Sequence, residues 1–303
     1  MKNKVLLEIK RRFKTSNGYC GSWDSTDILC PQVNGLVNIC LTELGFEKET
    51  EKNLRTFLQS PSFDKKTGLF YREVDLDGNV VVPNFNVCKN AVFALSLAPY
   101  FSDEAKIILG NLKNSPAYLV KSKLYGREFN TFQVNPLIIT QSNLWMALAY
   151  SKLGLNKETE QIVHALEKNR FQQGLFNSQD CRGTDYKTKF FLDDQALAIL
   201  AYIELGQQEK AKQIIGTTIN NFYDSKMGLF NSSTDDNVKS TYKNSLMAQS
   251  LAKLDYKEEL INLQKGLVRE LYDSKERLFN QTTIDSTKVP DNSALALVTL
   301  NYR

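Results

Sequence analysis

Residues 193–206 read DDQALAILAYIELG, an apolar run that begins with two aspartates and ends in a Leu-Gly pair. Apolar side chains fill almost every position, which is typical of a helix buried on all sides, and a Gly after the last apolar residue is a common helix stop. The stretch is one copy of a repeat. The other copies are 33–45 (VNGLVNICLTELG), 89–101 (KNAVFALSLAPYF), 142–154 (SNLWMALAYSKLG), 243–254 (KNSLMAQSLAKL) and 291–300 (DNSALALVTL).

A polar residue directly precedes each apolar run, and we align the copies on it. The aligned residues are Asn34, Asn90, Asn143, Asp194, Asn244 and Asn292. Successive intervals are 56, 53, 51, 50 and 48 residues, which is the range of repeat architectures. Asn and Asp are favoured helix N-caps because their side chains accept hydrogen bonds from the free N–H groups of the first turn. We therefore predict that these residues cap six buried helices.

A second type of helix precedes most of these runs. Residues 156–171 (NKETEQIVHALEKNRF) carry one apolar stripe on a charged background, which predicts an outer helix with one solvated face. A turn follows such helices, as in FDKKTGLF at 63–70 and FYDSKMGLF at 222–230, and it predicts a tight turn into an extended segment. Asp64, Asp224 and Asp273 recur at one place in this turn, so we interpret them as turn formers.

The two ends of the chain complete the pattern. The last inner helix runs to Arg303 with no outer helix after it, whereas residues 1–13 resemble an outer helix with no inner helix before it. We therefore predict that the N-terminal helix packs as the outer helix of the sixth hairpin and closes a ring. The predicted fold is all-α, an (α/α)6 toroid, and residues 1–303 form a single domain because no linker composition interrupts the repeats.

Composition limits the kind of protein. The formal charge of the 303 residues is +4, from Lys and Arg that are not clustered, which predicts no nucleic-acid partner. No apolar run approaches the roughly 20 residues of a membrane span, and the N-terminus lacks the pattern of a signal peptide. Five cysteines without a CxxC pair predict neither a disulfide framework nor a zinc site. We expect a cytoplasmic protein without metal or cofactor, whose oligomeric state the sequence leaves open.

Together with these repeats, the segment GLFNSQDCRGTDYKTKFFLDDQALA (174–198) makes the chain resemble the six-hairpin toroid superfamily over its whole length. It looks most like the unsaturated-uronyl hydrolases and the sugar-epimerase-like toroids. The resemblance implies an enzyme acting on a carbohydrate, and we expect a glycoside hydrolase acting on an oligosaccharide, which can be anionic. Two departures bear on this expectation. The uronyl hydrolases carry another Asp about one repeat earlier, where 131–145 holds no acid, and the epimerase-like members depend on paired histidines, where this chain has only His164.

The predicted site lies where all six inner helices begin. Their positive N-termini converge there and favour carboxylates and anionic ligands, and the longer loops at 70–89, 126–142 and 176–193 wall it. The candidate catalytic residues are Asp193, Asp194 and Asp24, because glycoside hydrolysis typically needs two carboxylates. For Asp193 and Asp194 two interpretations stay open, a catalytic pair or a double helix cap. The candidate substrate-binding residues are Trp23, Tyr125, Tyr186 and Phe191, which can stack on sugar rings, and Arg127 and Arg182, which can bind an anion.

Two other functions remain as alternatives. NGYCGSW at 17–23 resembles the Gly-x-Trp repeats of terpenoid cyclases and prenyltransferases, but it occurs once and lacks their acid and zinc-ligand motifs. A toroid that binds a glycan or a partner protein without catalysis is the other alternative. The spacing of carboxylates discriminates between these functions: acid pairs about 5–9.5 Å apart across the cavity favour hydrolysis, and a cavity with one acid and many aromatic residues favours the terpenoid or binding roles.

Overall fold

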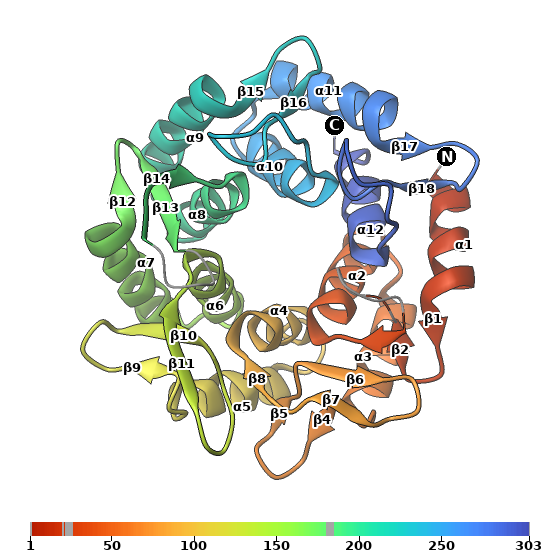
Figure 1. Ribbon diagram of the computed structural model, residues 1–303, viewed down its shortest axis with the longest axis vertical. Helices are drawn as coiled ribbons and strands as arrows, with labels where there is room; N and C mark the ends of the chain where they lie inside the picture. Colours follow the sequence, from red (N-terminus) through yellow and green to blue (C-terminus); the bar gives the residue numbers. More distant parts are fainter. Residues whose placement is uncertain (1, 20, 22–26, 180–184, 303) are drawn as a thin grey trace.

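The computed structural model describes residues 2–19, 21, 27–179 and 185–302. In these residues six inner helices form a ring and six outer helices surround it, which confirms the predicted (α/α)6 toroid (Figure 1). The inner helices are α2 (Pro31–Glu43), α4 (Val87–Leu97), α6 (Thr140–Lys152), α8 (Leu192–Glu204), α10 (Thr241–Lys253) and α12 (Pro290–Thr299). The outer helices are α1 (Lys2–Phe13), α3 (Glu47–Leu58), α5 (Ser102–Lys113), α7 (Asn156–Arg170), α9 (Gln208–Phe222) and α11 (Lys257–Gly266), which the π-helical turn η1 (Leu267–Leu271) continues.

The two ends of the chain close the ring as predicted. The N-terminal helix α1 packs against α12, and α12 packs against α2 on its other side (Figure 1). The hydroxyl of Tyr302, just after α12, donates to Oε2 of Glu43 at the end of α2, at 3.1 Å. Helix α1 is therefore the outer helix of the sixth hairpin.

Burial separates the inner from the outer helices. In α8 every residue from Leu192 to Tyr202 is buried, because inner helices have neighbours on all sides. In α7 the buried residues include Thr159, Ile162 and Leu166, which share one face, while His164 is exposed on the other face. The hydrophobic core thus fills the space between the two rings, and it leaves the ends of the inner helices for polar residues.

A short β-hairpin follows each outer helix and supplies the turn that the sequence predicts. Gly68, Gly174 and Gly228 take positive φ angles of 65°, 81° and 67° in these turns, and Arg277 takes the same conformation in place of a glycine. The hairpins are β1 (Lys14–Thr15) with β2 (Gly18–Tyr19), β4 (Phe63–Asp64) with β5 (Leu69–Phe70), β9 (Tyr118–Leu119) with β10 (Leu124–Phe129), β12 (Phe171–Gln172) with β13 (Leu175–Gln179), β15 (Tyr223–Asp224) with β16 (Leu229–Phe230), and β17 (Tyr272–Asp273) with β18 (Leu278–Phe279).

The longer connections contain further strands where the sequence analysis expects only loops. β3 pairs antiparallel with β6, which pairs with β7, while β10 extends between β8 and β11, and β13 pairs with β14. The added strands are β3 (Ile28–Leu29), β6 (Glu73–Asp75), β7 (Val80–Val82), β8 (Phe85–Asn86), β11 (Val134–Ile138) and β14 (Asp185–Phe190). All of them precede an inner helix, so these small sheets wall the face of the ring where the inner helices begin.

The prediction that the aligned asparagines cap the inner helices is wrong. Most of these side chains bind the backbone of the preceding hairpin instead. Asn90 lies one turn inside α4, is fully buried, and binds the backbone of the preceding hairpin. Its Oδ1 accepts from the N–H of Phe70 at 2.8 Å, and its Nδ2 donates to the carbonyl of Phe70 at 3.0 Å. We call this arrangement the amide clamp. The clamp residues are Asn34, Asn90, Asn143, Gln195, Asn244 and Ser293, the last through its hydroxyl alone.

The clamp corrects the alignment of the repeats. Gln195 of α8 binds Phe176 as the asparagines bind their hairpins, at 2.8 Å from the N–H and 2.7 Å to the carbonyl. Asp194 therefore does not occupy the position of the asparagines, and the N-cap of α8 is Phe191. The residues that begin the inner helices as N-caps are Cys30, Asn86, Ile139, Phe191, Ser240 and Val289.

Candidate functional site

In the corrected alignment, neither aspartate at the start of α8 has the structural role that the clamp residues have in each repeat. Asp193 and Asp194 are the second and third residues of α8, and neither is a cap or a clamp residue. Thus the double-cap interpretation is wrong for this pair. The second residue of each inner helix lies in its first turn, where the helix N-terminus favours negative charge. Five of these second residues prove to lie close together: Cys88, Gln141, Asp193, Tyr242 and Asp291.

Tyr242 of α10 lies at the centre of this second-residue layer. The Nε2 group of Gln141, on α6, donates to the Tyr242 hydroxyl at 3.2 Å. The side chain of Tyr242 is buried, and burial raises its pKa well above the ordinary value, with Cys88, Asp193 and Asp291 adding to the effect through their negative charges. A neutral hydroxyl therefore stands between the carboxyl groups of two inner helices, α8 and α12.

Asp193 faces a cation from the neighbouring inner helix. Its Oδ1 lies 2.9 Å from Nζ of Lys243, the third residue of α10. The same ammonium group lies 4.5 Å from the centre of the Phe191 ring and donates to the carbonyl of Ser232 at 3.2 Å. The side chain of Asp193 keeps 11% of its surface exposed. This geometry holds a charged carboxylate at the edge of solvent, next to a partly exposed aromatic ring.

Asp194 differs from Asp193 in its surroundings. It is only 1% exposed, and burial raises the pKa of its carboxyl group well above the ordinary value, with the charge of Asp193 raising it further. The Ser178 hydroxyl and the charge of Lys243 oppose this shift. Burial and the neighbouring negative charge both make the ionised form of Asp194 less favourable, so its carboxyl group favours the neutral form.

Asp291 is the residue of α12 that corresponds to Asp193, and it has no lysine partner. It is 1% exposed, and burial raises its pKa to about 6, against the lowering effect of the N–H groups of Asn292 and of its own backbone. Its Oδ1 accepts from the N–H of Asn292 at 3.0 Å, while Oδ2 has no hydrogen-bond partner among the described residues. Thus one layer holds a carboxylate paired with Lys243 and a carboxyl that keeps its proton up to mildly acidic pH.

A polar cavity of about 200 Å³ opens beside this layer, at the N-termini of α4 and α6. Lys89 and Arg72 line it, and both pair with Glu73, at 3.0 and 3.2 Å, while Arg72 also pairs with Glu128 at 3.2 Å. Arg127 lines the cavity too, and within the described ranges no carboxylate pairs with it. The complete lining is Gln32, Arg72, Asn86, Cys88, Lys89, Arg127, Ile139, Gln141 and Ser142. The cavity therefore offers cations and amides without a lining carboxylate.

The structure brings some of the predicted site residues together and separates others. Asp193, Asp194 and Phe191 meet at the start of α8, and Arg127 lines the cavity beside α4 and α6. Tyr125 is fully buried, and its hydroxyl lies 2.9 Å from that of Tyr150 in the core, so it packs the fold and contacts no cavity on this face. Asp24, Trp23, Arg182 and the side chain of Tyr186 lie outside the described residues.

Sequence reasoning missed Asp291 as the second carboxyl, and it missed the lysines Lys89 and Lys243 on this face. Asp291 aligns with Asp193 in the sequence repeat, and this equivalence is the signal that could have identified it. Lys89 and Lys243 are likewise the third residues of their helices, as Asp194 is. The alignment made from the sequence did not show this equivalence of Lys89, Lys243 and Asp194, because it placed Asp194 at the position of the asparagines.

No helix among the described residues has the length and apolar character needed to cross a bilayer. No three His, Cys, Asp or Glu side chains in the described ranges gather into a group able to hold a metal ion.

Comparison with known proteins supports the fold. No protein-family model matches the sequence, and a search of curated proteins gave no match. Among solved structures, the chain is similar to a cellobiose 2-epimerase from Spirochaeta thermophila, with a TM-score of 0.79, 12% identity, and coverage of 98% of this chain and 93% of that one. A D-mannose isomerase matches with a TM-score of 0.76, 13% identity, and coverage of 99% and 96%. A GH76 alpha-mannanase from Bacteroides thetaiotaomicron matches with a TM-score of 0.73, 14% identity, and coverage of 99% and 94%.

Proposed function

We propose that the protein is a carbohydrate-active enzyme whose site lies at the N-terminal ends of the inner helices. The similar structures named above are described as a sugar isomerase, a sugar epimerase and a mannanase, and fold similarity alone does not select a reaction. The support from this chain is local. Buried carboxyl groups and a cavity lined by cations and amides gather on this face.

The reaction we propose is glycoside hydrolysis, and the pair Asp193 and Asp291 carries the proposal. Such hydrolysis needs one carboxylate that is ionised and one carboxyl that donates a proton to the leaving oxygen. The environments of this pair differ in the required sense, because Lys243 faces Asp193 and burial raises the pKa of Asp291 to about 6. Asp193 then acts as the base or nucleophile, and Asp291 acts as the general acid. Asp194 is the other candidate for the acid.

Several features favour hydrolysis over the alternatives. An epimerase of this fold class would use paired histidines, whereas the single histidine, His164, is exposed on the outer helix α7. A terpenoid cyclase or prenyltransferase would need an apolar cavity lined by aromatic residues, whereas Arg72, Lys89 and Arg127 line the cavity on this face. A binding module without catalysis would gain nothing from two desolvated carboxyl groups, which are unfavourable to bury.

We further propose that the substrate carries a negative charge, as a uronic acid does. Arg127 lines the polar cavity and has no carboxylate partner in the described part of the chain. Arginine binds carboxylates through two parallel hydrogen bonds, and the helix N-termini around the cavity add positive potential. A sugar carboxylate on Arg127 would lie beside the second-residue layer.

The experiment is a product screen by mass spectrometry with neutral, uronic and unsaturated oligosaccharides. Asp193→Asn and Asp291→Asn should each lower turnover by at least about 100-fold, in the range that positioned acid or base groups contribute. Asp194→Asn separates the two candidate acids, since the variant of the proton donor should lose turnover with leaving groups that need protonation, whereas Asp193→Asn should lose it with all leaving groups. An activated aryl glycoside, which leaves without protonation, should partly restore the variant of the true acid.

The matched control is Asp77→Asn, in the exposed turn between β6 and β7. It removes the same charge from the same face of the ring and should leave turnover within about twofold. Folding of every variant is checked by circular dichroism. The hydrolase proposal fails if no sugar is cleaved, or if cleavage persists in both Asp193→Asn and Asp291→Asn.

A further inference from the structure

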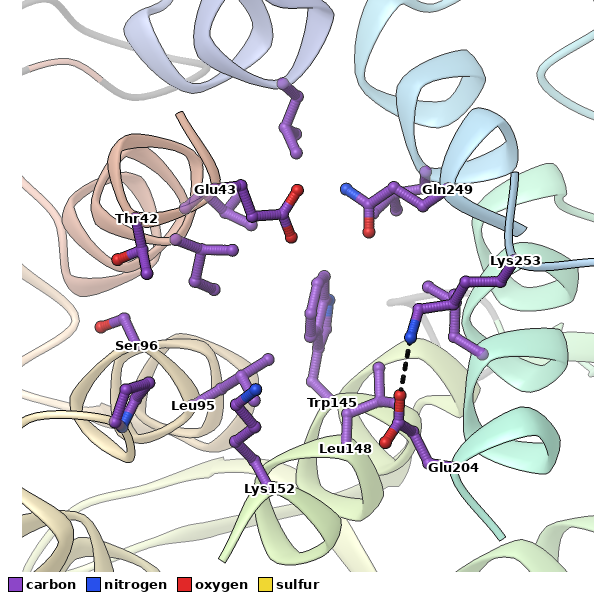
Figure 2. A pocket seen from close by; sticks show the side chains of 16 residues that line it. Thr42, Glu43, Leu95, Ser96, Trp145, Leu148, Lys152, Glu204, Gln249 and Lys253 are labelled. Carbon is purple, nitrogen blue, oxygen red and sulfur yellow. Dashed lines mark hydrogen bonds and ion pairs between the residues drawn. The ribbon is translucent and has the colours of Figure 1, made fainter. Parts of the chain in front are cut away.

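A second cavity lies at the opposite end of the ring, where the inner helices end. Its volume is about 190 Å³, and residues of all six inner helices line it (Figure 2). The lining residues are Leu36, Ile39, Thr42, Glu43, Leu95, Ser96, Pro99, Trp145, Leu148, Lys152, Leu200, Glu204, Leu246, Gln249, Lys253 and Leu295. Neither the proposed hydrolysis nor the similarity to other toroids assigns a task to this end.

The floor of this cavity is apolar and rigidly built. Leu36, Leu246 and Leu295 are each only 1% exposed, and Trp145 is 4% exposed with its ring against the cavity. Figure 2 shows the indole in the middle of the lining side chains. An apolar cavity of about 150 Å³ is known to hold benzene. This floor therefore has room for one aromatic ring or one branched aliphatic side chain.

The rim of the cavity carries charges of both signs, from the last turns of the inner helices. Lys253 and Glu204 pair with each other, Nζ to Oε1, at 3.0 Å (Figure 2). Glu43 and Lys152 form no ion pair with any described residue, although both line the cavity. Among the residues that the structure describes, the Tyr302 hydroxyl is the one donor to the Glu43 carboxylate, at 3.1 Å. The rim thus presents one carboxylate and one ammonium group without ionic partners.

The Glu43 carboxylate lies where a bound cation would stabilise its charged form. Its side chain reaches solvent at the mouth, yet the surrounding protein desolvates it and raises its pKa, against the hydroxyl of Tyr302 and the charges of Lys253 and Lys152. The C-termini of six inner helices also carry partial negative charge toward this end. Figure 2 shows the Gln249 amide across the mouth from the Glu43 carboxylate, with its nitrogen toward Glu43. A ligand ammonium group placed at the mouth would have the Glu43 carboxylate as its acceptor.

We propose that this cavity binds a free α-amino acid with an aromatic or branched apolar side chain. The ammonium group of the ligand binds Glu43, its carboxylate binds Lys152, and its side chain packs against Trp145 on the apolar floor. A lone amine would leave Lys152 without a partner, and a lone carboxylic acid would leave Glu43 without one. A zwitterion satisfies both groups, and the floor selects the side chain by size.

The test is isothermal titration calorimetry of the full chain with L-phenylalanine and L-leucine, against three analogues that each lack one part. Phenethylamine lacks the carboxylate, 3-phenylpropionate lacks the ammonium group, and glycine lacks the side chain. We expect saturable binding of at least one of the two amino acids, and a loss of affinity of about 10- to 100-fold for each analogue, since hydrogen bonds to charged groups contribute at this level. Fluorescence of Trp145 gives a second signal in a Trp23→Phe background, because the chain has two tryptophans.

Variants test each contact separately. Glu43→Gln should weaken binding of the amino acid about tenfold or more and leave the affinity for 3-phenylpropionate unchanged. Lys152→Met should also weaken binding of the amino acid, and it should leave the affinity for phenethylamine unchanged. Glutamine still accepts from Tyr302, so the first variant keeps that link. Glu47→Gln and Lys157→Met, both exposed on outer helices, are the matched controls.

Three results would overturn the proposal. One is no binding of either amino acid at millimolar concentration. The second is binding of phenethylamine or 3-phenylpropionate as tightly as of L-phenylalanine. The third is amino-acid affinity that survives both Glu43→Gln and Lys152→Met, which would place the ligand elsewhere.

Discussion

Replacing a clamp residue by alanine tests how the repeat is held together. In Asn90→Ala, the N–H and the carbonyl of Phe70 both lose a buried partner, at 2.8 and 3.0 Å in the intact chain. Each unsatisfied buried group destabilises a protein by about 1–3 kcal/mol, so we expect Asn90→Ala to lower the free energy of unfolding by about 2–5 kcal/mol. Ser293→Ala removes one bond only, from the N–H of Phe279 at 3.0 Å, and should lower it by about 1–3 kcal/mol.

The assay is urea unfolding followed by far-ultraviolet circular dichroism, with the same buffer for all variants. Asn220→Ala is the control, because Asn220 is exposed on α9 and alanine is the better helix former there; its free energy of unfolding should change by less than about 0.5 kcal/mol. The reasoning is refuted if Asn90→Ala is no more destabilising than Asn220→Ala, or if Ser293→Ala proves the more damaging of the two clamp variants.

Three further predictions concern the site. The carboxyl of Asp291 has a pKa of about 6 in the folded chain, against 3.8 in the unfolded chain. Because the folded state binds more protons between these pH values, the free energy of unfolding should fall by about 3 kcal/mol as the pH rises through them. Urea titrations of Asp291→Asn should lack this fall. Since Asp291 is the proposed acid, kcat/KM should also decline as the pH rises above about 6. Lys243→Met leaves Asp193 without its partner at 2.9 Å and should lower kcat/KM about 10- to 100-fold, whereas the exposed Lys226→Met should not. Arg127→Gln should raise KM for a uronic substrate by about tenfold or more and leave KM for a neutral one unchanged, as steady-state kinetics with matched oligosaccharides would reveal.

The fold could be read from the sequence because it depends on patterns that repeat. The alternation of helices buried all round with helices of one apolar face predicts the two rings, and the unpaired helix at residues 1–13 predicts their closure. The structural role of the asparagines could not be predicted from the sequence. An amide residue near the start of a helix gives the same sequence pattern whether it caps the helix or binds the preceding hairpin. Gln195 shows the reason. Its longer side chain makes the same two bonds as Asn143, so the clamp is defined by geometry and not by residue type.

The charge states of the site depend on neighbours that the sequence does not bring together. Asp193 and Asp291 occupy the same position in equivalent helices, so both receive the same favourable field from a helix N-terminus, about 0.3–1 kcal/mol. Burial acts in the opposite direction and is the larger effect at Asp291, where it raises the pKa to about 6. At Asp193 the ammonium group of Lys243 lies 2.9 Å away on the next helix and forms an ion pair with it. The two acids of the proposed mechanism therefore differ because α10 carries a lysine at its third position where α2, which follows α12 around the ring, carries Val33.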